Sequence, residues 1–302
     1  MRGKTINMFL MDGTPTGRIK CTIANWTGVV YKISRADLEL CKNRNDLKQS
    51  GVYFLFGASN DTGKPVAYIG QAGNRKNGEG ILNRLFEHKR NADKDYWTEA
   101  VVFTTSNNSF GPTEISFLEN KFCNLAIKAN RYEVKNGNEP SLGHITEEKE
   151  SEMEEFVEYS RLIMGILGHN IFEPVAIIKP ETDSKINDND NDNDNDNDVT
   201  FYMKRKIQSI NFYVDASGKQ TAEGFVVLKG SKISPQIKDV ISASTRNARS
   251  NAKIDAESVL LEDVLFASPS GAGEFVIGNT CNGWTNWKTK DGVSLKDFEN
   301  RS

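Results

Sequence analysis

A run of six Asn-Asp pairs, from Asn187 to Asp198, is the feature that most constrains how this chain of 302 residues can fold. The run contains no apolar side chain, so burial cannot offset the conformational entropy lost on ordering it. Calcium-binding loops also alternate Asp and Asn, but they require a turn glycine and a terminal glutamate, which this run lacks. We therefore predict a disordered, self-repelling linker over residues 181–199, with a folded unit on each side.

The formal net charge of −3 belongs to this linker rather than to the folded units. Residues 181–198 carry one basic and eight acidic side chains, whereas residues 1–180 carry 23 and 22, and residues 199–302 carry 14 and 11. The two flanking parts are thus near neutral to mildly basic. That balance permits binding to nucleic acid without requiring it.

Cysteine and histidine usage argues against two classes of small stabilised domain. The cysteines lie far apart without a CxxC pair, which indicates a reduced, cytoplasmic protein rather than a disulfide framework or structural zinc site. The histidines show no metal-ligand spacing among themselves. Neither an N-terminal signal nor an apolar run of about 18 residues occurs, so we expect no export and no membrane insertion. These residues are Cys21, Cys41, Cys123 and Cys281, and His88, His144 and His169.

Residues 1–48 consist of short apolar runs separated by Asp-Gly and Thr-Gly pairs. This pattern predicts short strands joined by tight turns, followed by a brief helix that Ser34 caps. We expect a small β-rich subdomain packed on the next unit. A DNA-contacting module is the alternative.

Residues 49–180 have the pattern of a sheet flanked by helices. The continuously apolar strand at its start is typical of a strand covered on both faces. A second strand returns after a polar connection, and amphipathic helices with an apolar residue every three or four positions follow. The predicted strands are 52–56, 66–69 and 100–105, and the predicted helices are 81–93, 113–129 and 146–167.

Residues 200–302 predict a separate, small α+β domain. We expect a hairpin at 212–228 with a polar turn at Asp215 to Gly218, and a helix or strand at 260–265. Trp284 and Trp287 lie close together near the end of the chain. They are either core aromatics of this domain or, with Lys288, a stacking surface for nucleic acid.

Glu119 is the most informative single residue. The helix predicted from Thr113 has an apolar stripe, and Glu119 falls on it, four residues after Ile115 and three before Phe122. A carboxylate that faces the protein is costly unless it is paired or coordinates a cation. A salt bridge and a metal ligand both satisfy that requirement.

Arg84 and His88 lie one turn apart at the edge of the buried face of the helix predicted from Ile81. A guanidinium can bind a phosphate through two parallel hydrogen bonds, and an imidazole can hold a water or a leaving oxygen. Lys89 and Arg90 extend the basic character outward, as a track for a nucleic-acid backbone requires. By itself such a pair is also compatible with an ordinary helix surface.

Taken together, these residues resemble the GIY-YIG nuclease superfamily over about residues 51–130. The resemblance is carried by Gly51-Val52-Tyr53, Tyr68-Ile69-Gly70, Arg84 with His88, and Glu119. It implies a small three-stranded antiparallel sheet flanked by helices, and DNA cleavage with one Mg²⁺ or Mn²⁺. Residues 200–302 also look like an uncharacterised domain often appended to such nucleases. That second resemblance is carried by Gly230-Ser231, Ser268-Pro269-Ser270 and the stretch from Asn282 to Lys288.

The resemblance also implies roles for the site residues. Tyr53 would act as general base or proton relay, Tyr68 would position it, and Glu119 would anchor the metal. Arg84 would hold the transferring phosphoryl group, while the role of His88 varies among similar proteins. A free tyrosine has a pKa of about 10, so base action at neutral pH needs a lowered pKa or a relay.

Two features depart from the family pattern. Val52 replaces the isoleucine, which is a harmless change of volume on a buried strand. The connection between Tyr53 and Tyr68 is long, and Gly73 to Gly80 looks like a further insertion; both would alter substrate access rather than remove the chemistry. Because all five polar positions are filled, we expect an active enzyme.

The sequence thus predicts a divalent-metal-dependent DNA endonuclease with a role in restriction, repair or a mobile element. Residues 49–180 would be catalytic, and residues 200–302 would be an accessory domain with the candidate DNA contacts Trp284, Trp287 and Lys288. Two alternatives stay open. One is a catalytically idle scaffold that binds DNA or a protein, and the other is a nuclease that cuts RNA.

Overall fold

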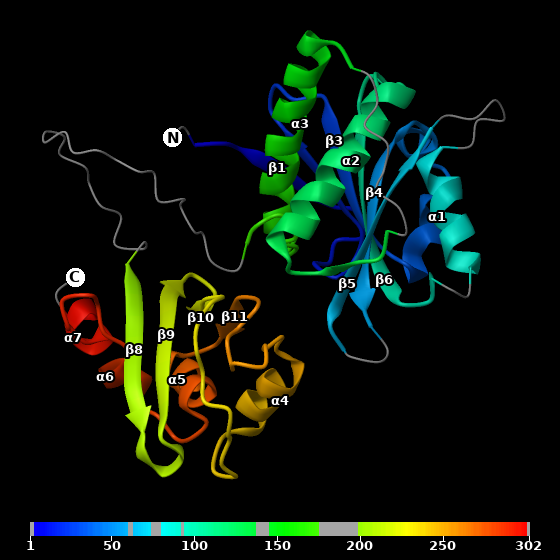
Figure 1. Cartoon of the computed structure of the whole chain (residues 1–302). Helices are drawn as coiled ribbons and strands as arrows, with labels where there is room; N and C mark the ends of the chain where they lie inside the picture. The colour runs from blue at the N-terminus through cyan, green and yellow to red at the C-terminus, as the bar shows by residue number, and fades with distance from the viewer. Residues whose placement is uncertain are drawn as a thin grey trace, which may run out of the picture. The chain divides into compact units, whose positions relative to one another are not determined.

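The computed structural model describes residues 3–59, 63–73, 80–91, 94–136, 145–174 and 199–300. The chain divides into two compact units, Met1–Pro174 and Val175–Ser302 (Figure 1). Both units combine helices and strands, so the predicted α+β class is confirmed. Several sequence expectations lie outside the described residues: the linker over 181–198, His144, and the insertion at 74–79.

The first unit is built on a seven-stranded sheet with the order β1-β2-β3-β6-β4-β5-β7. Neighbouring strands are antiparallel except β5 and β7, which are parallel. The strands are β1 Ile6–Leu10, β2 Ile19–Ile23, β3 Gly28–Ser34, β4 Gly51–Ala58, β5 Pro65–Ala72, β6 Trp97–Thr105 and β7 Glu133–Val134. The three strands predicted at 52–56, 66–69 and 100–105 therefore form the antiparallel group β6-β4-β5.

The first 48 residues do not form the separate β subdomain that the sequence predicts. Strand β3 pairs with β6 from Gly28↔Thr105 to Ser34↔Glu99, so the N-terminal strands continue the same sheet. Five of the seven residues of β3 are buried, with Val30 in one core and Val29, Tyr31 and Ile33 in the other. Pairing along β6 removes an edge that would otherwise leave backbone groups unpaired.

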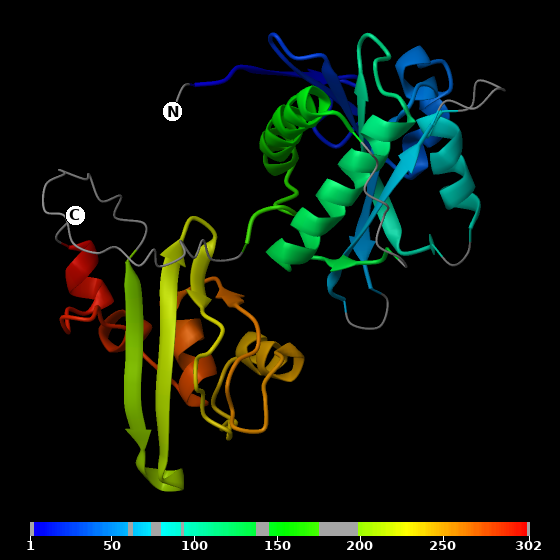
Figure 2. The same ribbon diagram turned by 45° about the horizontal axis from the view of Figure 1, so that its top comes forward.

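Helices cover both faces of this sheet (Figure 1, Figure 2). Helix α2 (Pro112–Ala129) and helix α3 (Glu147–Ile166) share one core with Val52, Phe54 and Phe56 of β4. Helix α1 (Ile81–Arg90) and the 3₁₀ helices Ala36–Cys41 and Asn45–Lys48 share the other core with Tyr53 and Leu55. Alternate residues of β4 enter different cores, which is why the run is continuously apolar and why the tyrosine of the first motif faces α1.

The start of one helix differs from the predicted one. Helix α2 begins after Gly111, with Pro112 in its first turn, and the Glu114 carboxylate accepts the Gly111 N–H at 3.1 Å. The predicted cap, Thr113, lies inside the helix, because proline is well suited to the first helical position. Helix α3 begins at Glu147 directly after its N-cap Thr146, whose hydroxyl accepts the Lys149 N–H, so the predicted start is confirmed.

The second unit contains a four-stranded antiparallel sheet with the order β11-β10-β9-β8. Its strands are β8 Thr200–Ile207, β9 Phe212–Thr221, β10 Gly224–Val227 and β11 Val264–Phe266. Its helices are α4 Ala243–Asn251, α5 Pro269–Ile277, α6 Gly283–Asn286 and α7 Leu295–Glu299. The core includes Phe201, Phe225, Phe275 and Trp287, which come from strands and helices alike.

The turn predicted at Asp215 to Gly218 is wrong, because both residues lie within β9 and the strand continues to Thr221. Gly218 serves packing instead: a Cβ there would lie 2.5 Å from the ring of Phe225. A glycine inside a strand often marks such a close approach rather than a turn.

Candidate active site at the edge of the first sheet

Tyr53 and Tyr68 lie side by side on the face of the sheet that α1 covers. The register pairs Tyr53 with Gly70 and Leu55 with Tyr68, which directs both tyrosines to this face, and their ring centroids are 6.3 Å apart. A Cβ on Gly70 would lie 2.4 Å from the Tyr53 hydroxyl oxygen. Position 70 therefore requires glycine, because the Tyr53 side chain approaches its backbone closely.

His88 contacts Tyr53 directly. Its Nε2 lies 2.7 Å from the Tyr53 hydroxyl, and its ring centroid is 5.4 Å from that of Tyr53 and 5.2 Å from that of Tyr68. His88 is buried, although it stands near the end of α1. His88, whose predicted role was the least definite, is thus the hydrogen-bond partner of Tyr53, the predicted base.

Arg84 lies one turn before His88 on α1 and lines a hollow in the surface. Its Nη1 is 2.5 Å from the Glu87 carboxylate, and its side chain is 38% exposed. The positive charge of Arg84 also favours the charged form of Tyr53, against the larger opposing effect of burial on the Tyr53 pKa. The hollow has a volume of about 190 Å³ and is lined by Gln71, Ala72, Gly73, Gly80, Asn83, Arg84 and Glu87.

Glu119 approaches the same place from the opposite face of the sheet. It lies on α2, and its Oε2 accepts a hydrogen bond of 2.8 Å from the Nε2 of Gln71, near the end of β5. Its negative charge contributes to the raised pKa values of both Tyr53 and Tyr68. The five residues predicted from the sequence are therefore brought together around the end of β5.

The edge of β5 is accessible at this end because its outer neighbour is short. Strand β7 pairs only with Val66 and Ala67 of β5. Beyond β7, the Asn136 side chain takes the place of a strand. Its Oδ1 accepts the Ile69 N–H at 3.1 Å, and its Nδ2 donates to the Ile69 carbonyl at 2.6 Å. Among the described residues, no strand pairs with the outer edge of Gly70 to Ala72. At this edge the Glu119 carboxylate, from one face of the sheet, and the Arg84 guanidinium, from the other, can reach the same substrate.

The protonation states follow from burial and from the local positive charges. Burial, with the charges of Lys94 and Arg84, lowers the pKa of His88 to about 4, so this imidazole is neutral at pH 7. Burial also raises the pKa of Tyr53 above its ordinary value, so its resting form is the phenol. A neutral imidazole can accept a proton from the phenol beside it. Proton transfer through this pair therefore need not begin from a free phenolate.

Lys94 is a residue that the sequence reasoning missed. Its Nζ lies 3.3 Å from the centroid of the Tyr68 ring, and burial and the charge of Arg84 lower its pKa to about 8. Gln71 and Asn136 were missed as well. No local pattern marks any of the three, since each acts through a partner distant in sequence.

Glu119 fits a divalent cation held mainly by water and substrate. Burial raises its pKa, and in the described part of the chain its hydrogen-bond partner is the neutral amide of Gln71 rather than a cation. No group of three His, Cys, Asp or Glu residues there is arranged to hold a metal by protein ligands alone. Mg²⁺ commonly uses one or two carboxylates, with waters and phosphate oxygens completing its shell.

The other predicted DNA contacts differ in how far their side chains are exposed. Arg90 is exposed at the end of α1, while Lys89 before it is half-buried. In the second unit, Trp287 is fully buried against Phe225, and its indole N–H donates to the Pro269 carbonyl at 3.0 Å. The predicted stacking pair is therefore not formed: Trp287 is a core aromatic, and only Trp284, at 37% exposed, reaches the surface.

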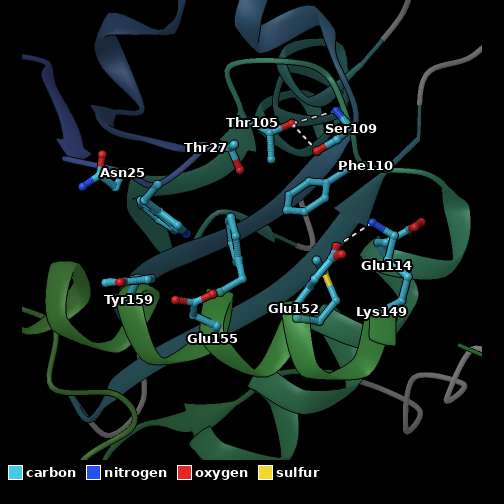
Figure 3. A pocket seen from close by; sticks show the side chains of 13 residues that line it. Asn25, Thr27, Thr105, Ser109, Phe110, Glu114, Lys149, Glu152, Glu155 and Tyr159 are labelled. Atoms are coloured by element: carbon cyan, nitrogen blue, oxygen red, sulfur yellow. Dashed lines mark hydrogen bonds and ion pairs between the residues drawn. The ribbon is translucent and has the colours of Figure 1, made fainter. Parts of the chain in front are cut away.

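A second hollow, of about 240 Å³, lies on the α3 side of the first unit and contains none of the predicted site residues (Figure 3). Aromatic side chains and carboxylates line it, and Lys149 pairs with Glu152 at 2.6 Å on its wall. The buried indole nitrogen of Trp26 has no hydrogen-bond partner among the described residues. Its lining residues are Asn25, Trp26, Thr27, Thr105, Ser109, Phe110, Glu114, Lys149, Glu152, Met153, Glu155, Phe156 and Tyr159.

Comparison with known proteins gives one match. Residues 206–299 match a family model described as a domain of unknown function, DUF4357. This stretch falls within residues 200–302, for which the sequence resembles an appended uncharacterised domain. No curated protein and no solved structure matches the chain. Within the described residues, no helix is both long and apolar enough to cross a membrane.

The low pKa of His88 has a consequence for stability. Its folded pKa of about 4 lies below the ordinary value of 6.5, so the unfolded chain binds the proton more tightly. The free energy of unfolding should therefore fall as the pH drops from about 6.5 toward 4, by up to about 3 kcal/mol from this group. His88→Gln keeps a polar partner for Tyr53 without the titration, so urea unfolding at several pH values should show a shallower fall. Parallel curves for the two proteins would contradict the assignment.

Proposed function

We propose that this protein is a divalent-metal-dependent endonuclease of the GIY-YIG type that hydrolyses phosphodiester bonds in DNA. The observation that carries this is the Tyr53 hydroxyl, buried beside Tyr68 and 2.7 Å from the Nε2 of His88. Sequence-distant residues of β4, β5, α1 and α2 supply a proton acceptor, a phosphate-binding cation and an acidic metal ligand at one edge. The order and type of these residues support the same family.

The contact between Tyr53 and His88 suggests a proton relay. A water attacking the phosphorus would give a proton to the Tyr53 oxygen while the Tyr53 hydroxyl proton moves to His88 Nε2, in the tautomer that carries hydrogen on Nδ1. The phosphorus–oxygen bond to the leaving strand breaks as the bond to water forms. Because burial raises the pKa of Tyr53, a concerted transfer avoids a free buried phenolate.

Arg84 and Glu119 would handle the negative charge of the phosphate. Arg84 lines the hollow at the end of β5 and carries a half-exposed guanidinium that can turn from Glu87 to phosphoryl oxygens. Glu119 would hold the cation, with Gln71 fixing the orientation of its carboxylate. A bound Mg²⁺ or Mn²⁺ would polarise the phosphate and stabilise charge on the departing oxygen.

A substrate panel tests this function. The full chain is incubated with duplex, branched and single-stranded DNA and with single-stranded RNA, each with Mg²⁺, Mn²⁺ or EDTA. We expect nicking or cleavage of at least one DNA with metal and none with EDTA. Binding without cleavage under either metal would replace the proposal with the idle scaffold, and cleavage of RNA alone would replace it with an RNA nuclease.

A further inference from the structure

Strand pairing in the second unit sorts the side chains of β8 and β9 onto two different faces. Phe201 and Met203 of β8, with Val214 and Ala216 of β9, point into the core. Helices α5, α6 and α7 lie on this side of the sheet (Figure 1). The alternate residues of the same strands point to the other face, which no described helix covers over β8 and β9.

This open face carries tyrosines and lysines. From β8 come Tyr202, Lys204 and Lys206, and from β9 come Tyr213, directly opposite Lys206, and Asp215, directly opposite Lys204. Tyr213 is 53% exposed, and Lys204 is bonded to Asp215, which raises the pKa of this lysine. On this face Lys204 stands two residues from Tyr202 along β8 and diagonally across from Tyr213 on β9.

A bridge extends the face by one more cation. Lys288 pairs with Tyr202 in antiparallel register, so its side chain stands on the same side, while the preceding Trp287 enters the core. Lys204 is paired with Asp215 at 3.1 Å, but no ion pair in the described residues involves Lys206 or Lys288. The face thus has a net positive charge around two aromatic rings.

We infer that the open face of β8 and β9 binds single-stranded DNA, with the two tyrosines stacking on bases and the lysines binding phosphates. Aromatic rings interleaved with cations are the usual platform for single strands, because every base has a π-face and every linkage a charge. Tyr202 lies four residues along β8 from the position opposite Tyr213, which is about 13 Å. Lys204 lies midway between them.

Duplex DNA fits this face less well. Its bases are stacked inside the double helix and offer no free ring surface to a tyrosine on a sheet, so only the lysines would contribute. The choice of DNA over RNA rests on the proposed function, whereas the binding of a single strand rests on the side chains of this face alone.

Fluorescence anisotropy of the full chain in EDTA tests the inference without cleavage. The probe is a labelled oligo-dT of about 20 nucleotides, compared with a duplex and an oligo-rU of equal length. Tyr213→Ala should weaken oligo-dT binding at least about fivefold through lost stacking. Lys206→Gln with Lys288→Gln should lower the slope of log affinity against log salt by about 1.4.

The matched control is Lys238→Gln with Lys296→Gln. Both lysines are exposed, with Lys238 bonded to the C-terminal end of α5 and Lys296 on α7, away from the open face. This pair should leave affinity and salt slope unchanged. Equal losses in the control, tighter binding of duplex or of RNA than of oligo-dT, or intact binding by the Tyr213 variant would each overturn the inference. Because EDTA prevents cleavage, binding here with no nuclease activity would overturn the proposed function alone.

Discussion

Glu119→Gln should reduce Mg²⁺- or Mn²⁺-dependent DNA cleavage at least about 100-fold, because a metal's stabilisation of the transition-state charge is worth several kcal/mol. The substitution keeps the size of the side chain and removes only its charge. Gln71 can still bond the new amide oxygen, so the fold of α2 and β5 is retained. Initial rates of cleavage under saturating metal are the measurement.

The same variant should have a distinct thermal signature. Burial raises the pKa of Glu119, so its charged form destabilises the folded state at neutral pH in the absence of metal. The metal-free variant should therefore melt at the same temperature as wild type or higher, and added Mn²⁺ should raise the melting temperature of wild type only. Glu158→Gln, at an exposed position of α3, is the matched control and should behave as wild type. Retained cleavage by the Glu119 variant would refute the assigned metal ligand.

Tyr53→Phe should lower the cleavage rate by about 10²- to 10⁴-fold, the range typical of a removed acid–base group. The ring would still pack over Gly70, but His88 Nε2 would lose its hydrogen-bond partner. Leaving a buried polar group unpaired costs about 1–3 kcal/mol, so the variant should also unfold at a lower urea concentration. Single-turnover cleavage and urea unfolding measure the two effects.

Tyr31→Phe separates the loss of catalysis from the loss of stability. Tyr31 is another buried tyrosine in the α1-side core, two strands from Tyr53 across Val102, and its hydroxyl bonds the Asp46 carboxylate rather than His88. That variant should be destabilised in the same way yet cleave DNA at nearly the wild-type rate. If both tyrosine variants lose activity equally, the effect of Tyr53 is structural and the proton relay is wrong.

Local patterns predicted most of the first unit correctly. Helices α1, α2 and α3 and strands β4, β5 and β6 all lie where apolar spacing indicated them. The errors concern residues whose role depends on distant partners. Gly218 looked like a turn residue and instead makes room for Phe225. For Trp287 the sequence left a core position and a stacking position open, and the structure places it in the second core.

The N-terminal strands illustrate the same limit. Their turns and alternation are local signals, so their existence was predictable. Which strand they join is not local: β3 pairs with β6, about 70 residues later in the chain, and this merges a predicted subdomain into one sheet. Pairing partners depend on which edges remain free after the rest of the sheet has formed.

The sequence by itself determined that the chain has two units, that Tyr53 belongs to a buried strand, and that Glu119 faces the protein on an apolar stripe. These follow from composition and from the 2.0- and 3.6-residue periods of strands and helices. Only the tertiary structure decided what each side chain meets. The register of β4 against β5 places Tyr53 over Gly70, the packing of α1 brings His88 to its hydroxyl, and the short β7 leaves the edge where Glu119 meets Gln71. Contacts of this kind arise between segments far apart in the chain, so no local period encodes them.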